Sequence, residues 1–305
     1  MANFNIVPSF TVFALSDSNS DVNGESEDNM NLDEAPESSN VEDSRGMGGK
    51  IAVGGAGAVL LLILGLVFGP DFLQQFQGQQ GNDQAPVKQV GPDKTSQFVK
   101  KVLGTTEAVW GSEFQKMGET YSAPHLKLFS DRVHTGCGLA PAAVGPFYCP
   151  ADKTVYLDPT FFDELEVKLG GSKAEFSQAY VIAHEVGHHV QNLLGYNSRR
   201  GTMEEHDFSV RLELQADYLA GVWAYHGNKM FRFIEAGDVE SAIKSANAIG
   251  DDRLQRRAGG FVHPEKFTHG TSNQRVRWFR DGLETGDASK EKLDTFFTIG
   301  SSKDL

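Results

Sequence analysis

The sequence predicts an α+β fold that is mainly helical, with a small β-sheet, after one transmembrane helix. Three observations support this prediction. Residues 51–69 form an uncharged apolar run, residues 125–158 contain short strand-like stretches, and the remainder of the chain after residue 96 has helical periodicity. Strands that precede a run of helices are typical of an α+β domain. A chain of 305 residues that is 39% hydrophobic can bury the core of such a domain.

The first 50 residues are expected to form a disordered acidic tail. Residues 17–46 are rich in Ser, Asn, Asp and Glu and nearly devoid of aromatic side chains. Residues 1–70 hold ten acidic residues against Arg45 and Lys50. Such a composition buries too little apolar surface to become ordered. With a net charge of −13 and no basic stripe, the chain gives no electrostatic case for a nucleic-acid partner.

Residues 51–69 are expected to cross a membrane. This run has nineteen residues and no charge, enough for a helix to span roughly 30 Å of hydrocarbon. Arg45 and Lys50 precede it and Asp71 follows, so the positive-inside rule predicts a cytoplasmic N-terminus and places residues 71–305 outside the cytoplasm. Residues 70–95, rich in Gln and Gly, are the expected linker to a domain over residues 96–300.

Cys137 and Cys149 are expected to form a disulfide. They are twelve residues apart in a stretch whose glycines and prolines let the chain double back. Paired cysteines in an extracytoplasmic domain indicate a disulfide, and two buried free thiols are the alternative. The spacing excludes the C-x₂-C pair of a zinc site.

The outer domain is expected to begin with one or two helices over residues 96–121. Strands are predicted at residues 125–129, 146–149 and 154–157, where apolar and aromatic residues stand between turn residues. Helices are expected from there to the end of the chain.

One of these helices carries a candidate metal site. His184 and His188 are four residues apart, so on a helix both imidazoles lie on one face and can bind one metal ion. Glu185 stands where it can act as general base on a water at that ion. Apolar residues recur every three or four positions over residues 174–194, Gly195 suits the helix C-terminus, and Gly187 suggests a close approach. The alternative is a solvated helix face with two histidines by chance.

A third ligand is expected on a second helix. Glu213 and Asp217 are four residues apart beside an apolar face in residues 209–223. Glu213 can ligate zinc while Asp217 orients a ligand histidine through its other ring nitrogen. The alternatives are an exposed acidic pair, or His206 as a weaker ligand.

Several motifs together resemble a known family. The order of HEVGHH and ELQAD is similar to that of the glutamate-type zincins. The motifs GPFYCP, VYLD, HEVGHHVQ, RLELQADYLAGVW and HGTSNQR, with SSNVEDSRG before the apolar run, resemble the bacterial family named "putative neutral zinc metallopeptidases". The resemblance covers roughly residues 36–300. It implies a zincin-like catalytic domain on a single-pass membrane protein, one Zn²⁺ held by His184, His188 and Glu213, and Glu185 as the base.

The expected activity is that of a zinc metalloendopeptidase with a peptide or protein substrate. His269 is the preferred donor to the oxyanion, with His263 as the alternative. Arg275 is expected to pair with Asp217 or another carboxylate. If GPFYCP forms a strand beside the active-site helix, its edge can hold an extended peptide. The competing hypotheses are a non-catalytic zinc-binding scaffold and a zinc hydrolase of non-peptide amides such as cell-wall cross-links.

Overall fold

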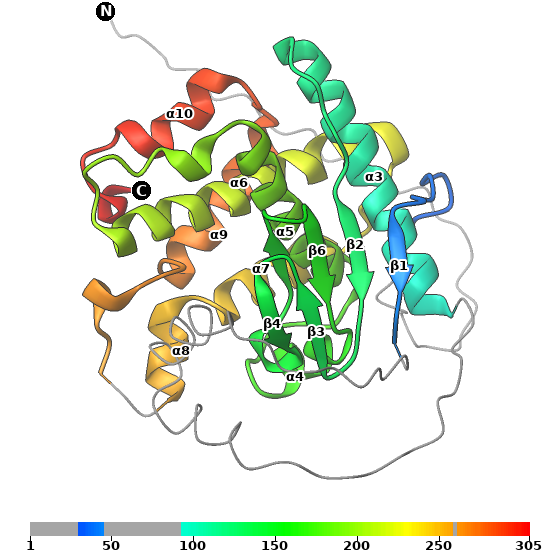
Figure 1. Ribbon diagram of the computed structural model, residues 1–305, viewed down its shortest axis with the longest axis horizontal. Helices are drawn as coiled ribbons and strands as arrows, with labels where there is room; N and C mark the ends of the chain where they lie inside the picture. Colours follow the sequence, from blue (N-terminus) through cyan, green and yellow to red (C-terminus); the bar gives the residue numbers. More distant parts are fainter. Residues whose placement is uncertain (1–29, 46–92, 259–260) are drawn as a thin grey trace, which may run out of the picture.

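The computed structural model describes residues 30–45, 93–258 and 261–305, and Figure 1 shows their arrangement. Helices predominate beside a small sheet, which confirms the predicted α+β class. The helices are α3 (Lys94–Met117), α4 (Thr160–Val167), α5 (Glu175–Leu193), α6 (Glu205–Phe231), α7 (Asp238–Ala248), α8 (Asp251–Arg257), α9 (Ser272–Thr285) and α10 (Lys290–Thr298). The strands are β1 (Val41–Asp43), β2 (His125–Leu128), β3 (Arg132–Thr135), β4 (Gly138–Pro141), β5 (Phe147–Cys149) and β6 (Thr154–Leu157).

The predicted membrane-crossing run 51–69 and most of the predicted linker lie outside the described residues. Within the described ranges, no helix combines the length and the apolar character that a membrane span needs.

The main sheet has the strand order β1-β2-β6-β5. Strands β1, β2 and β6 are parallel, and β5 runs antiparallel to β6. All four residues of β6 are buried, as expected for an inner strand with packing on both faces. Both α3 and α5 contribute to the core that covers the sheet. Strand β5 stands at one end of the strand order and is an edge strand of this sheet. It lies against α5, the helix of the HEVGHH motif.

The predicted disorder of the N-terminal tail is wrong for residues 30–45. Strand β1 pairs with β2, and Met30, Leu32 and Ala35 are buried in the main core. In Figure 1 this segment lies beside α3, although residues 46–92 separate the two in the sequence. The folded unit therefore begins before the predicted boundary at residue 96. The composition of this segment did not reveal its order. A few apolar side chains and one short strand are enough to order it, because the rest of the domain offers a sheet edge and a core to pack against.

Cys137 and Cys149 form the predicted disulfide. It links the turn between β3 and β4 to the end of β5. The β3-β4 hairpin was not predicted, because its residues read as turns between strands. The disulfide fastens this hairpin to the edge strand beside the HEVGHH helix.

Three packed helices, α5, α6 and α9, position the candidate site. Gly187 stands where α5 meets α6, and a Cβ there would lie 3.1 Å from the carbonyl oxygen of Ala216. The close approach expected at Gly187 is thus confirmed, and it brings α6 against the face that carries both histidines. Gly195 has the left-handed φ of +76° that follows a helix end, also as predicted.

Candidate metal centre

His184 and His188 of α5 face Glu213 of α6. The Nε2 atom of His184 lies 3.2 Å from Oε2 of Glu213, and Nε2 of His188 lies 3.4 Å from Oε1. One potential ligand atom from each residue lies within 4.8 Å of the others. His206, the weaker alternative, does not belong to this group. The helical spacing of the two histidines and the position of the acidic residue on α6 therefore bring the three predicted ligands together.

Each histidine is held through its other ring nitrogen. Nδ1 of His184 lies 2.9 Å from Oδ1 of Asp217, and Nδ1 of His188 lies 2.8 Å from Oε1 of Gln191. Both acceptors favour the tautomer with the proton on Nδ1, which leaves the Nε2 lone pair for a metal. The orienting role predicted for Asp217 fits this geometry. Gln191 was missed, although its position three residues after His188 on the same helix face was a usable signal.

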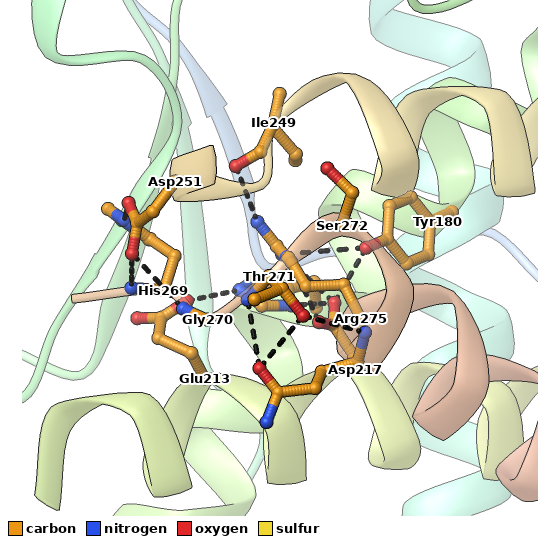
Figure 2. Close-up of polar contacts among 12 residues, drawn as sticks. Tyr180, Glu213, Asp217, Ile249, Asp251, His269, Gly270, Thr271, Ser272 and Arg275 are labelled. Atoms are coloured by element: carbon orange, nitrogen blue, oxygen red, sulfur yellow. Dashed lines mark hydrogen bonds and ion pairs between the residues drawn. The ribbon is translucent and has the colours of Figure 1, made fainter. Parts of the chain in front are cut away.

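Asp217 is the centre of a buried hydrogen-bond network, drawn in Figure 2. Its carboxylate accepts two hydrogen bonds from Arg275 of α9, at 2.8 and 2.9 Å, and one from the hydroxyl of Tyr180 at 2.6 Å. Burial alone would raise the pKa of Asp217, but Arg275 and His184 outweigh it and lower the pKa to about 2. Asp217 is therefore ionised near pH 7, and its hydrogen bonds to Arg275 and Tyr180 fix the orientation of its carboxylate. The predicted pairing of Arg275 is confirmed, whereas the part played by Tyr180 was not predicted.

A cleft of about 510 Å³ opens beside these residues, and Glu185 lines it. Glu185 is only 8% exposed. Its burial raises the pKa of its carboxyl group, and the nearby imidazoles of His184 and His188 offset part of that effect. A carboxylate with a raised pKa is suited to accept and return a proton. Part of the cleft lining is apolar and is formed by Val144, Phe161, Leu169, Val181, Ile249 and Leu254.

The two candidate oxyanion donors differ in position. His269 lines the cleft, and its Nδ1 lies 3.1 Å from Oδ1 of buried Asp251. Oδ2 of Asp251 also accepts the backbone N–H of His269 at 2.6 Å, so the loop and the ring are fixed together. Figure 2 shows this pair close to Glu213. His263 instead pairs with Glu265 and is half exposed, and it does not line the cleft.

His189 has a structural role away from the candidate ligands. Its Nε2 donates to the carbonyl oxygen of Ser122 at 2.6 Å, so its Nδ1 accepts from the hydroxyl of Tyr148 at 2.9 Å. Burial lowers the pKa of His189 to about 4, so it is neutral near pH 7. The pair fastens β5, which contains Tyr148, to α5.

The donor set fits zinc. Two imidazole nitrogens and one carboxylate are a typical ligand set for catalytic zinc, whereas calcium and magnesium prefer oxygen ligands alone. Both imidazoles have the orienting hydrogen bond that zinc-ligating histidines almost always make.

Comparison with known proteins agrees with this geometry. The model of the family described as "Putative neutral zinc metallopeptidase" matches residues 24–296, including the N-terminal segment that packs into the fold. "Uncharacterized protein YpfJ" of Escherichia coli strain K12 is 43% identical over 274 residues, which cover 83% of this chain and 95% of the relative. "Uncharacterized protein Rv2575" of Mycobacterium tuberculosis strain H37Rv is 44% identical over 203 residues, which cover 63% of this chain and 67% of that relative. No solved structure matches the chain. By the extent of the family match, the chain belongs to the family described as "Putative neutral zinc metallopeptidase".

Proposed function

We propose that the protein is a zinc metalloendopeptidase in which His184, His188 and Glu213 hold one Zn²⁺ and Glu185 is the general base. The observation that supports this most strongly is the convergence of two Nε2 atoms and one carboxylate beside a cleft that Glu185 also lines. A site that only stores or senses zinc has no need of a buried carboxylate in that position.

Zinc held by such ligands acts as a Lewis acid on a carbonyl group and lowers the pKa of water at the site. Glu185 then accepts a proton on its carboxylate as water attacks the scissile carbonyl carbon. The same carboxyl group returns the proton to the leaving nitrogen as the C–N bond breaks. Its raised pKa favours this exchange because a carboxyl group with a pKa nearer neutrality gives up the proton less readily to bulk water.

His269 is the proposed donor to the oxyanion. Asp251 engages Nδ1, so Nε2 is the ring nitrogen left to meet the substrate. In the protonated ring this nitrogen donates a hydrogen bond to the negative oxygen that develops during attack. Asp251 acts only through His269 and is a positioning residue.

The substrate in this proposal is an extended peptide. Strand β5 pairs with β6 along one side and has no partner strand on the other among the described residues. Pro146, Phe147 and Tyr148 line the cleft, so the free edge of β5 lies beside the metal centre. Backbone hydrogen bonds to such an edge hold a peptide irrespective of most of its side chains. The disulfide at Cys149 and the Tyr148–His189 hydrogen bond keep this edge in place.

The test uses the full-length chain with its zinc content measured and a proteome-derived peptide library as substrate. The proposal predicts cleavage by the wild type and loss of cleavage in Glu185→Gln, with zinc still bound. Zinc binding without cleavage by either protein favours the scaffold hypothesis. Release of amines from cell-wall fragments, with the peptides left intact, favours the amide-hydrolase hypothesis.

A further inference from the structure

The N-terminal segment 30–45 is bound to the catalytic domain along its whole length. Its backbone N–H groups donate to carbonyl oxygens in three separate parts of the domain. Asn31 donates to Phe233 in the loop after α6, Ser38 to Lys100 of α3, and Ser44 to Leu128 of β2. The side chain of Lys101 donates to the carbonyl oxygen of Leu32 at 2.9 Å. These contacts are distributed over α3, β2 and the loop that follows α6, so the segment is a part of the fold.

Helix α3 is shaped to receive this segment. A Cβ at Gly104 would lie 2.0 Å from the carbonyl oxygen of Pro36, so no side chain fits there while the segment is in place. Three residues further along α3, the carboxylate of Glu107 accepts hydrogen bonds from Ser38 at 2.6 Å and from Asn40 at 2.8 Å. The helix face therefore has both the space and the hydrogen-bond acceptor that residues 36–40 require.

The two ends of the intervening run 46–92 are also joined. Arg45 is the last described residue before the run and Asp93 is the first after it. The guanidinium group of Arg45 lies 2.9 Å from Oδ1 of Asp93, which also caps α3 by accepting the N–H of Ser96. The chain thus leaves the domain and returns to it at one place.

A single membrane crossing by residues 51–69 would place residues 30–45 and residues 93–305 in different compartments. Neighbouring strands of one sheet cannot be separated in this way, because their backbone hydrogen bonds require a spacing of about 5 Å. We infer that residues 30–45 and residues 93–305 lie in the same compartment, so that the N-terminal segment and the catalytic domain are not on opposite sides of a membrane. The sequence predicted a cytoplasmic N-terminus and a catalytic domain outside the cytoplasm. The inferred arrangement differs, because it places both in one compartment.

Cross-linking in membranes of cells that express the full-length chain tests this inference. Glu42 of β1 and Lys127 of β2 are opposite each other in the parallel register, with their charged groups 2.7 Å apart. The pair Glu42→Cys and Lys127→Cys is expected to cross-link within one chain under mild oxidation, seen as a linked pair of tryptic peptides. The matched control pair is Glu34→Cys with Lys127→Cys, in which position 34 lies outside the paired register. At least about tenfold less cross-linking is expected in the control, because disulfides form only between closely placed Cβ atoms.

Accessibility to a membrane-impermeant maleimide gives a second readout that does not need the β1-β2 pair to be altered. Single cysteines at exposed Ser39 and exposed Lys303 are labelled in intact spheroplasts and again after lysis. Equal labelling of the two positions in both preparations is expected. Labelling of one position and protection of the other in intact spheroplasts would overturn the inference, as would cross-linking no higher than in the control pair.

Discussion

The carboxylate of Asp217 joins His184 to Arg275. It lies 2.9 Å from Nδ1 of His184 on one side and accepts two hydrogen bonds from Arg275 on the other. All three side chains are buried. The imidazole of His184, which faces Glu213, is therefore oriented by an ion pair that connects α5, α6 and α9.

Asp217→Asn is expected to weaken zinc binding by about 10- to 100-fold, as is typical when the hydrogen-bond partner of a ligand histidine is removed. The measurement is a competition titration against a fluorescent zinc chelator. Because the substitution also leaves Arg275 without its buried charge partner, circular dichroism must first show that the variant is folded. Asp281→Asn, on the outer part of α9, is the matched control. Equal zinc affinity in a folded Asp217→Asn would contradict the orienting role.

Glu213→Gln is expected to lower zinc affinity by more than about 100-fold, because loss of a ligand exceeds the effect of losing its supporting residue. The same substitution at Glu205, which is 77% exposed at the start of α6, should change nothing. Both variants are compared by metal analysis after dialysis against a weak chelator. Retention of zinc by Glu213→Gln would show that the third ligand lies elsewhere.

Gly104→Ala is expected to destabilise the full-length protein by about 1–3 kcal/mol, as overpacking in a close contact does. The added methyl group would collide with the carbonyl oxygen of Pro36. Gly111→Ala on the same helix meets nothing within 4 Å and should be neutral, or stabilising by up to about 1 kcal/mol. Urea unfolding of both variants measures the difference. Equal stabilities would mean that residues 30–45 do not pack on α3.

The variant in which Ala replaces both Cys137 and Cys149 is expected to lose about 3 kcal/mol of stability, the loop-closure value for a ring of this length. Its kcat/KM for a peptide should fall as well, since the disulfide holds the edge strand that the peptide is proposed to pair with. Activity is assayed well below the unfolding temperature of the variant. Full peptidase activity there would argue against peptide binding at β5.

Local periodicity was sufficient to predict which residues form much of the candidate metal centre. His184 and His188 share a helix face by spacing alone, and Glu213 with Asp217 repeats that spacing on a second helix. Strands β2, β5 and β6 were predicted because their apolar residues stand between turn residues. In each case the signal lies within a few neighbouring residues.

The features that were missed depend on distant parts of the chain. Strand β1 is the polar tripeptide Val-Glu-Asp, and it is a strand only because β2, more than eighty residues later, offers an edge. Tyr180 reads as an ordinary core residue until α6 places Asp217 against its hydroxyl. Asp251 became relevant only when the loop before α9 brought His269 to it. No pattern within a single element contains these relationships.

X-ray absorption at the zinc edge of the full-length, zinc-loaded protein tests the metal centre most directly. Metal analysis is expected to give one zinc per chain. The expected spectrum shows two imidazole nitrogens and carboxylate oxygen at about 2.0–2.2 Å from the zinc. In His184→Ala the imidazole contribution should fall by half, or the metal should be lost. A spectrum unchanged by His184→Ala, or one dominated by sulfur ligands, would contradict a centre built from His184, His188 and Glu213.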